Sequence, residues 1–132
     1  MKSFKQVILV RRDLNMRRGK EIAQGSHASM EFLVHDLRVK LGADLASDVS
    51  ITLSEAERSW LASGMAKVCL QVHSEADLVA RHEKALANGL ESHLIRDSGR
   101  TEFHGEPTLT ACAIGPDEAE RIDAVTGDLQ LY

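Results

Sequence analysis

The chain has 132 residues, of which 43% are hydrophobic and 4% aromatic, and its formal net charge is −4. This length predicts one domain, residues 1–132, with a single core. The mildly negative charge argues against a protein that coats nucleic acid with a uniformly basic surface. We find no secretory signal, lipidation motif or apolar run long enough to span a bilayer, so we expect a cytoplasmic protein.

The first predicted elements are a strand and a long helix. Residues 5–11 form a short apolar run bounded by charge, which predicts a buried strand. The chain turns at residues 13–15, and a helix is predicted from about Arg17 until Gly42 ends it. Apolar residues at helical spacing predict its core face: Ile22, Ala23, Met30, Leu33, Val34, Leu37 and Leu41. A neighbouring polar stripe contains Lys20, Gln24, His27, Glu31 and Arg38.

The middle of the chain predicts a helix, a strand and another helix. The sequence Ser54-Glu-Ala-Glu57 has the form of a capping box, which predicts a helix to about residue 62. Residues 66–72 form the next apolar run and predict a strand. Ser74 is a further N-cap candidate, and the helix that it begins is expected to stop at residues 88–89, Asn-Gly.

The last third of the chain predicts a strand over residues 92–96, a loop over 98–107 and a strand over 108–114. Pro116, followed by two acidic residues, predicts the start of a last helix. The resulting order, β-α-α-β-α-β-β-α, contains two crossover connections and one short reversal. We therefore expect an α/β fold, namely a three-layer α/β/α sandwich with a four-stranded mixed, mostly parallel sheet.

Positive charge is concentrated at the start of the chain. The first twenty residues contain one acid, Asp13, and seven basic residues: Lys2, Lys5, Arg11, Arg12, Arg17, Arg18 and Lys20. This asymmetry suits a local phosphate-binding patch on an otherwise acidic chain. The alternative is that these residues are the ordinary solvated ends of a strand and a helix.

The cysteines and histidines show no pattern of metal ligands. Cys69 and Cys112 both lie in apolar runs that read as central strands, so we expect two buried, unpaired thiols. The six histidines form no His-Glu-x-x-His helix and accompany no paired Cys-x-x-Cys ligands. We therefore predict no metal site.

Polar residues that carry chemistry are predicted to meet at one edge of the sheet. Lys20, Gln24 and His27 share one side of the first helix, because positions i, i+4 and i+7 point nearly the same way. Lys20 lies at the start of that helix, where a cation opposes the helix dipole. Asp97 follows the third strand, at the carboxyl edge where ligands collect in such sheets. This arrangement predicts an anion-binding edge beside a polar stripe.

Four segments resemble, in order and approximate spacing, motifs of the type 2 peptidyl-tRNA hydrolases, the archaeal and eukaryotic type. They are residues 13–28, 97–101, 110–116 and 125–132. The segment 39–54 has no match. The resemblance implies a four-stranded mixed sheet in an α/β/α sandwich and hydrolysis of the ester that joins a peptide to the terminal ribose of tRNA. It implies no cofactor, peptidyl-tRNA as the nucleic-acid partner and a possible homodimer.

The resemblance implies catalytic roles for Lys20, Asp97 and Thr110. Asp97 would orient or deprotonate a water, and Lys20 would bind a terminal phosphate or offset charge on the ester carbonyl oxygen. Thr110 would align the participants, with Thr108 as the alternative match because the preceding loop departs from the family pattern. The implied substrate-binding residues are Arg17, Arg18, Gly19, Gln24, His27, Lys67, Arg100 and Thr101.

Each assignment has a structural alternative. Asp97 can be a turn residue that caps its own loop, Gln24 an exposed helix former and His27 a boundary residue packed on the sheet. Lys67 can extend from the edge of the sheet to solvent. Glu102 departs from the family pattern, which usually has glutamine there. With the altered loop 103–109, it motivates a second hypothesis, a non-catalytic RNA- or protein-binding homologue, and a third is an esterase for another small anionic substrate.

Overall fold

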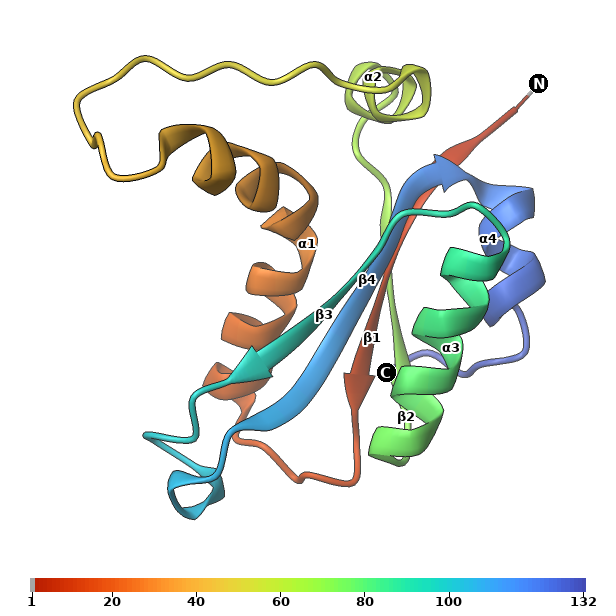
Figure 1. Ribbon diagram of the computed structural model, residues 1–132. Helices are drawn as coiled ribbons and strands as arrows, with labels where there is room; N and C mark the ends of the chain where they lie inside the picture. The colour runs from red at the N-terminus through yellow and green to blue at the C-terminus, as the bar shows by residue number, and fades with distance from the viewer. Residues whose placement is uncertain (1) are drawn as a thin grey trace.

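The computed structural model describes residues 2–132, which form a four-stranded sheet with helices on both faces (Figure 1). The strand order is β2-β1-β4-β3, and the strands are β1 (Phe4–Arg11), β2 (Lys67–Val72), β3 (Ser92–Asp97) and β4 (Thr108–Glu118). β1 and β2 pair in parallel, whereas β4 is antiparallel to both β1 and β3. Three strands therefore run the same way although only one neighbouring pair is parallel, and the predicted mixed sheet is confirmed.

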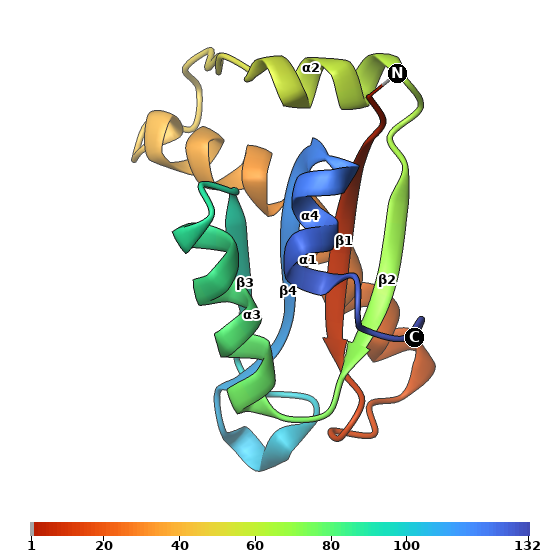
Figure 2. The ribbon, with the colours of Figure 1, turned by 90° about the vertical axis from the view of Figure 1, so that its right-hand side faces the viewer.

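The helices form one layer on each face of the sheet. α1 (Arg18–Leu41) covers one face, and α3 (Glu75–Ala87) and α4 (Ala119–Thr126) cover the other (Figure 2). α2 (Glu55–Ala62) lies across the end of the sheet where β1 begins. Within residues 2–132, no helix combines the length and apolarity that a membrane span requires.

The two faces of the sheet bury different amounts of apolar surface. Between the sheet and α3 and α4 lies the larger core, with fully buried residues that include Leu9, Leu78, Ile114 and Ile122. The core under α1 is smaller and consists mostly of Ile8, Val10, Ala28, Ala111 and Ala113. Burying one Leu or Ile side chain contributes about 1.5–3 kcal/mol, so the first core carries most of the hydrophobic stabilisation.

The predicted core face of α1 is wrong for Ile22, Ala23 and Met30, which are exposed. Ile22 and Met30 are 64% and 58% exposed, whereas Gln24, Ala28 and Phe32 are buried and face inward at positions i, i+4 and i+8. The sheet beneath α1 offers small side chains and polar partners rather than a wide apolar surface. Near its start, α1 therefore turns Gln24 and Ala28 toward the sheet and Ile22 and Met30 outward, whereas its later apolar residues are half-buried, namely Leu33, Val34, Leu37 and Leu41.

A buried polar contact secures α1 to the sheet. The side-chain amide of Gln6, which is fully buried in β1, donates to the Ser29 carbonyl oxygen at 3.0 Å. The Ser29 hydroxyl donates to Gln6 Oε1 at 2.7 Å. Because both polar groups of the Gln6 side chain have partners, its burial does not leave an unsatisfied amide.

The predicted capping box of α2 and the end of this helix at residue 62 are confirmed. The capping box is present, because Ser54 Oγ accepts from the Glu57 N–H and the Glu57 carboxylate accepts from the Ser54 N–H. α2 also carries Trp60, which packs edge-to-face on Phe32 of α1 with ring centroids 5.8 Å apart. The unmatched segment 39–54 contains the end of α1 and an irregular, largely exposed stretch that reaches α2.

Two further predictions need correction. β4 continues through Glu118 because Asp117 and Glu118 pair with the start of β1, so α4 begins at Ala119 and not at Pro116. Cys112 is buried in a central strand as expected, but Cys69 is exposed because β2 is an edge strand. Both thiols are free.

Candidate active site

The candidate site lies where β1 and β3 end and α1 begins, at the lower end of the molecule in Figure 1. β1 ends at Arg11, and the chain returns through a turn to start α1 at Arg18. β3 ends at Asp97 and leads into the loop 98–107. The topology therefore brings the first turns of α1 beside the carboxyl end of β3, although the two segments are about eighty residues apart in sequence.

Asp97 is surrounded by hydrogen-bond donors. Its Oδ1 accepts from Lys20 Nζ at 2.9 Å and from Gln24 Nε2 at 3.2 Å. Its Oδ2 accepts from the backbone N–H of Gly99 at 2.9 Å. The Asp97 side chain is only 10% exposed, so these three donors supply most of the solvation that the carboxylate would otherwise take from water.

The donors determine the charge of Asp97. Burial alone would raise its pKa, but the hydrogen bond from Lys20, the Gly99 N–H and the nearby ammonium charge outweigh burial. The pKa of Asp97 is therefore lowered below its ordinary value of 3.8. At neutral pH the carboxylate is ionised, which makes it a hydrogen-bond acceptor and a weak base.

Lys20 links Asp97 to the following loop. Its ammonium group donates to Asp97 at 2.9 Å and to the Thr101 hydroxyl at 2.7 Å, and its side chain is 16% exposed. An ammonium group has three N–H bonds. Contacts within residues 2–132 use two of them, which leaves one to donate to a bound substrate.

Thr110 reaches this network through Gln24. The Thr110 hydroxyl donates to Gln24 Oε1, and both side chains are buried. Gln24 therefore joins Asp97, through its amide nitrogen, to Thr110, through its amide oxygen. The interpretation of Gln24 as an exposed helix former is wrong, because only 2% of the residue is exposed.

A β-bulge directs Thr110 toward α1. Ala111 faces α1 and Cys112 faces α3, so strict alternation would place Thr110 on the α3 side. The register instead pairs Ile95 with Ala111 and Arg96 with Leu109, which leaves Thr110 as an extra residue in β4. Bulges of this kind re-aim side chains beside functional sites. Thr108, the alternative match, bonds only locally, to the Glu106 carbonyl at 2.8 Å.

The loop after β3 is held in one conformation by Gly99. This residue has φ +84°, and a Cβ atom there would lie 2.3 Å from the Glu106 carbonyl oxygen. Only glycine fits at this position. The Gly99 carbonyl accepts from the Gly105 N–H at 3.0 Å, and Phe103 packs against the core under α1. The loop therefore presents Thr101 and the Gly99 N–H in fixed positions.

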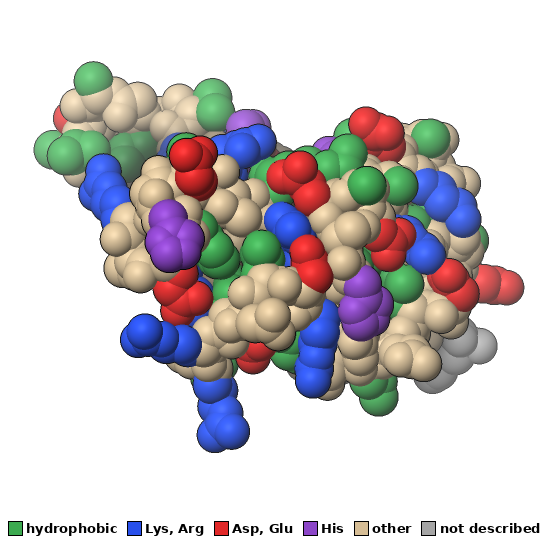
Figure 3. All heavy atoms as spheres, turned by 90° about the horizontal axis from the view of Figure 1, so that it is seen from below, with side chains coloured by type: hydrophobic (Ala, Val, Ile, Leu, Met, Phe, Trp, Pro, Cys, Tyr) green, Lys and Arg blue, Asp and Glu red, His purple; other side chains and the backbone are tan. Residues whose placement is uncertain are grey.

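Exposed cations surround this network without forming a uniformly basic surface. Arg17, Arg18 and Arg100 are exposed, and Gly19 lies between Arg18 and Lys20 in the first turn of α1. Arg17 Nε is 3.9 Å from the Glu102 carboxylate, so the acid that departs from the family pattern faces a cation. Figure 3 views this end of the molecule and shows Lys and Arg side chains projecting beside acidic ones.

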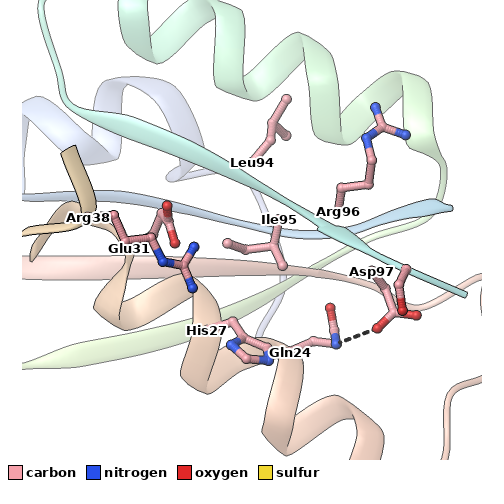
Figure 4. Close-up of a pocket in the computed structure, with 9 residues that line it drawn as sticks. Gln24, His27, Glu31, Arg38, Leu94, Ile95, Arg96 and Asp97 are labelled. Atoms are coloured by element: carbon pink, nitrogen blue, oxygen red, sulfur yellow. Dashed lines mark hydrogen bonds between the residues drawn. The ribbon is translucent and has the colours of Figure 1, made fainter. Parts of the chain in front are cut away.

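A groove of about 390 Å³ continues from the network between α1 and β3. Figure 4 shows Gln24, His27, Glu31 and Arg38 projecting from α1 toward β3, with Asp97 at one end. The lining residues from β3 and its loop are Leu94, Ile95, Arg96, Asp97 and Ser98. His27 is exposed in this groove, so its interpretation as a residue packed on the sheet is wrong.

The predicted substrate-binding residue Lys67 and the acid Asp13 lie outside the network. Lys67 is the first residue of β2, beside Gln6 of β1, at the opposite end of the sheet from Lys20. Its ammonium lies 5.1 Å from the centre of the Trp60 ring. Asp13 does lie at the functional edge, but it pairs with Arg11, whose Nη2 is 2.7 Å from the Asp13 carboxylate. Residues 2–132 contain no group of three or more His, Cys, Asp or Glu side chains arranged to hold a metal ion.

Sequence reasoning missed the backbone donor of Gly99 and the lining residues Leu94, Ile95, Arg96 and Ser98. The Gly99 donor is a backbone N–H, which leaves no signal of its own in the residue types. The strand residues Leu94, Ile95 and Arg96 read as ordinary β-formers. The one signal for the groove was the predicted polar stripe of α1, because all the α1 residues that line the groove belong to it: Gln24, His27, Glu31 and Arg38.

The chain is similar to known peptidyl-tRNA hydrolases over nearly its whole length. The family model "Peptidyl-tRNA hydrolase PTH2" matches residues 4–132. Among curated relatives, each named peptidyl-tRNA hydrolase, the Methanopyrus kandleri protein is 44% identical over 97% of this chain and 97% of its own length. The Methanocaldococcus jannaschii protein is 40% identical over 97% of this chain and 99% of its own. The Aeropyrum pernix protein is 41% identical over 98% of this chain and 96% of its own length.

The matches include the start of α1, the end of β3 and β4, which are the segments that supply Lys20, Asp97 and Thr110. They also extend over nearly the full length of both this chain and its relatives. The chain belongs to the PTH2 family of peptidyl-tRNA hydrolases.

Proposed function

We propose that this protein hydrolyses the ester bond between a peptide and the terminal ribose of tRNA, and so returns the tRNA for reuse. The observation that carries the proposal is the hydrogen-bonded network of Lys20, Asp97, Gln24 and Thr110 at the carboxyl end of β3. Membership of the family supports the substrate class. The contacts of the network support the roles that follow.

The reaction requires a water molecule to add to the ester carbonyl carbon. Asp97, held ionised by its donors, accepts a hydrogen bond from this water and orients it toward the carbonyl. The C–O bond to the ribose then breaks, and the proton from the water passes to the departing ribose oxygen. The second proton of the water is released to solvent as the peptide acid ionises. The products are a peptide carboxylate and a tRNA with a free terminal hydroxyl group.

Lys20 supplies the electrostatic part of this mechanism. As the water adds, negative charge develops on the carbonyl oxygen, and the remaining N–H of Lys20 can donate to it. Asp97 and Thr101 fix the ammonium group beforehand, so little reorganisation is needed as the charge develops. Thr110 acts through Gln24, because its hydroxyl fixes the amide that donates to Asp97.

The tRNA end is held by charges around the start of α1. Arg17, Arg18 and Arg100 are exposed there and can contact phosphate groups. The first turn of α1 adds backbone N–H groups and the positive end of the helix dipole, and Gly19 lets a phosphate approach closely. Phosphate contacts of this kind weaken as salt concentration rises.

The test is release of free tRNA from an N-blocked aminoacyl-tRNA, measured for the wild type, Lys20→Ala and Asp97→Ala with a chelator at moderate salt. We expect turnover by the wild type and loss of turnover in both variants, because the proposed chemistry uses no metal. Asp128→Ala is the matched control, since it removes an ion pair of similar length away from the site.

Three results would contradict the proposal. Unchanged turnover in Lys20→Ala or Asp97→Ala would exclude the network. Loss of wild-type turnover with the chelator would exclude a metal-independent reaction. A folded wild type that binds tRNA without turnover would instead support the non-catalytic binding homologue.

We also propose that two copies of the chain pair through the outward row of α1. Ile22 and Met30 project from the same side of the helix and are 64% and 58% exposed, and a second copy offers the same surface. We expect a dimer by light scattering and a monomer for Met30→Glu. Leu86→Glu is the control, because Leu86 is also exposed but lies on α3, on the other face of the sheet. A wild type that is monomeric at micromolar concentration would contradict this proposal.

A further inference from the structure

The backbone groups along the two edge strands of the sheet differ in their hydrogen-bond partners. Along β2, the C-terminal residues provide partners: the Gln71 N–H donates to the Gln130 carbonyl at 3.0 Å, and the Tyr132 N–H donates to the Cys69 carbonyl at 3.0 Å. Along β3, the only strand pairing within residues 2–132 is with β4. Alternate residues of β3 therefore keep outward-facing backbone donors and acceptors, which can pair with another extended chain.

The groove beside the active site follows this free edge. Successive side chains of a strand point to opposite faces of the sheet. In Figure 4, Leu94 and Arg96 project to one side of β3, and Ile95 and Asp97 project to the other. Because the groove contacts all four residues in succession, it runs along the edge of the strand and not across one face.

The groove is also continuous with the proposed site of chemistry. Gln24 and Asp97 line it and bond to each other at 3.2 Å. From Gln24 to Glu31 along α1 is a rise of about 10 Å. This length corresponds to about three extended residues. If the ester carbonyl of a bound peptide lies at Lys20 and Asp97, the third residue of the peptide, counted from the ester, therefore lies beside Glu31.

We propose that the peptide part of peptidyl-tRNA lies extended in this groove and pairs, backbone to backbone, with the free edge of β3. The inference rests on the proposed function and adds where the peptide binds. Recognition through main-chain groups suits an enzyme that must accept many peptide sequences. The side chains around the groove are of mixed charge, with Glu31, Arg38 and Arg96, and therefore select no single peptide charge.

The first experiment compares KM for N-acetyl-aminoacyl-tRNA and for tripeptidyl-tRNA with the same ester-linked residue and the same tRNA. We expect about a tenfold lower KM for the tripeptide, since each added backbone hydrogen bond contributes a few-fold. N-methylation of the second or third peptide amide tests the pairing. Only alternate residues face β3, so one methyl group should remove most of the gain and its neighbour should not.

The variant Glu31→Trp places a bulky ring beside the third residue of the peptide. In the wild type, the KM for N-acetyl-aminoacyl-tRNA divided by the KM for tripeptidyl-tRNA is expected to be about ten. In this variant we expect that ratio to fall toward one. Glu83→Trp is the control, because Glu83 is exposed on α3, on the other face of the sheet. Circular dichroism and thermal unfolding of both variants establish that each one is folded.

The outcomes separate this inference from the proposed function. Turnover of all substrates with a KM independent of peptide length and of N-methylation would overturn the peptide path alone. An equal rise in KM for both substrates in Glu31→Trp would assign the groove to the tRNA end. No turnover of any substrate would overturn the proposed function and this inference together.

Discussion

Two close ion pairs show how differently this fold uses a carboxylate. Lys20 Nζ and Asp97 Oδ1 are 2.9 Å apart, whereas Arg81 and Asp128 make two contacts, Nη1–Oδ1 at 2.5 Å and Nη2–Oδ2 at 2.9 Å. The Asp97 side chain is 10% exposed, whereas the Asp128 side chain is 68% exposed. Distance alone therefore does not distinguish a functional pair from a structural one.

The two carboxylates differ in whether water could solvate them if their basic partner were removed. Water can solvate Asp128 if Arg81 is removed, because Asp128 lies at the surface after α4. Water reaches little of Asp97, so its charge depends on Lys20, Gln24 and Gly99. A buried carboxylate that keeps its charge through hydrogen bonds also holds the donors in place. Asp97 is therefore suited to position the ammonium group to which we assign the electrostatic role.

The sharpest test of the comparison is Asp97→Asn. Asparagine has nearly the same shape but no charge, so Lys20 loses its counter-ion and the water loses its anionic acceptor. We expect kcat/KM for an N-blocked aminoacyl-tRNA to fall by about 10² to 10⁴-fold. Asp128→Asn, assayed in parallel, should keep wild-type turnover. Equal losses in the two variants would mean that the two carboxylates do not differ in function.

Thr110→Val tests the buried end of the network, which reaches Asp97 only through Gln24. The substitution keeps the side-chain shape but removes the hydroxyl that donates to Gln24. We expect kcat to fall about tenfold with KM nearly unchanged, because Gln24 would no longer be held against Asp97. The buried, unpaired amide oxygen should also lower the free energy of unfolding by about 1–3 kcal/mol. A drop in stability with no change in kcat would make Thr110 purely structural.

The acid limb of the pH–rate profile tests the lowered pKa of Asp97. In the wild type, the pKa lies below 3.8, so its charge should not limit kcat/KM until the pH falls below that value. In Lys20→Met, burial is no longer outweighed by the ammonium, so the pKa should rise and the limb should move to higher pH. Residual activity must be followed only where circular dichroism shows a folded protein. A limb at the same pH in both proteins would contradict this account.

The same carboxylate links pH to stability. Because the folded-state pKa of Asp97 is lowered, its contribution to stability is present above the pKa of the unfolded chain and is lost as pH falls through the folded value. Lys20→Met should therefore weaken the dependence of unfolding free energy on pH in the acid range. Urea unfolding at several acid pH values measures this effect.

The smallest effect is expected from Asp128→Asn. The Arg81 hydrogen bonds hold the pKa of Asp128 down at about 2, but the carboxylate stays in contact with solvent. Arg81 also donates to the Val125 carbonyl oxygen at 2.9 Å, which remains in the variant. We expect only a slight decrease in Tm and unchanged kcat/KM. A large loss of either would show that the surface pair is more important than its exposure indicates.

Much of the fold was predictable because its signals are local. The capping box at Ser54, the stop at Asn88 and Gly89 and the apolar strand runs each act within a few residues. The inward face of α1 was not predictable, because it depends on what the sheet offers. Its apolar row read as a core face, yet the sheet beneath α1 presents Gln6 and Thr110. Tertiary contacts therefore determine which residues in the first half of α1 face the sheet.

The candidate site was predictable to a similar extent. Lys20 and Asp97 were identified from the end of a strand and the start of a helix, and the structure joins them. The choice between Thr108 and Thr110 depended on a bulge that adds one residue to β4, which no pattern in the residues indicates. Lys67 is a charged residue in an apolar run, and the family resemblance implied that it binds substrate. In the structure it instead lies against the Trp60 ring, at the opposite end of the sheet from Lys20.

The most direct test of the central claim, that Lys20 and Asp97 act as one unit, is a double-mutant cycle on kcat/KM. The four proteins are the wild type, Lys20→Met, Asp97→Asn and the double variant, each shown to be folded and to bind tRNA. The account predicts that the double variant is about as slow as the slower single variant, because either change already disables the pair. Losses that multiply in the double variant would show that the two residues act independently and would contradict it.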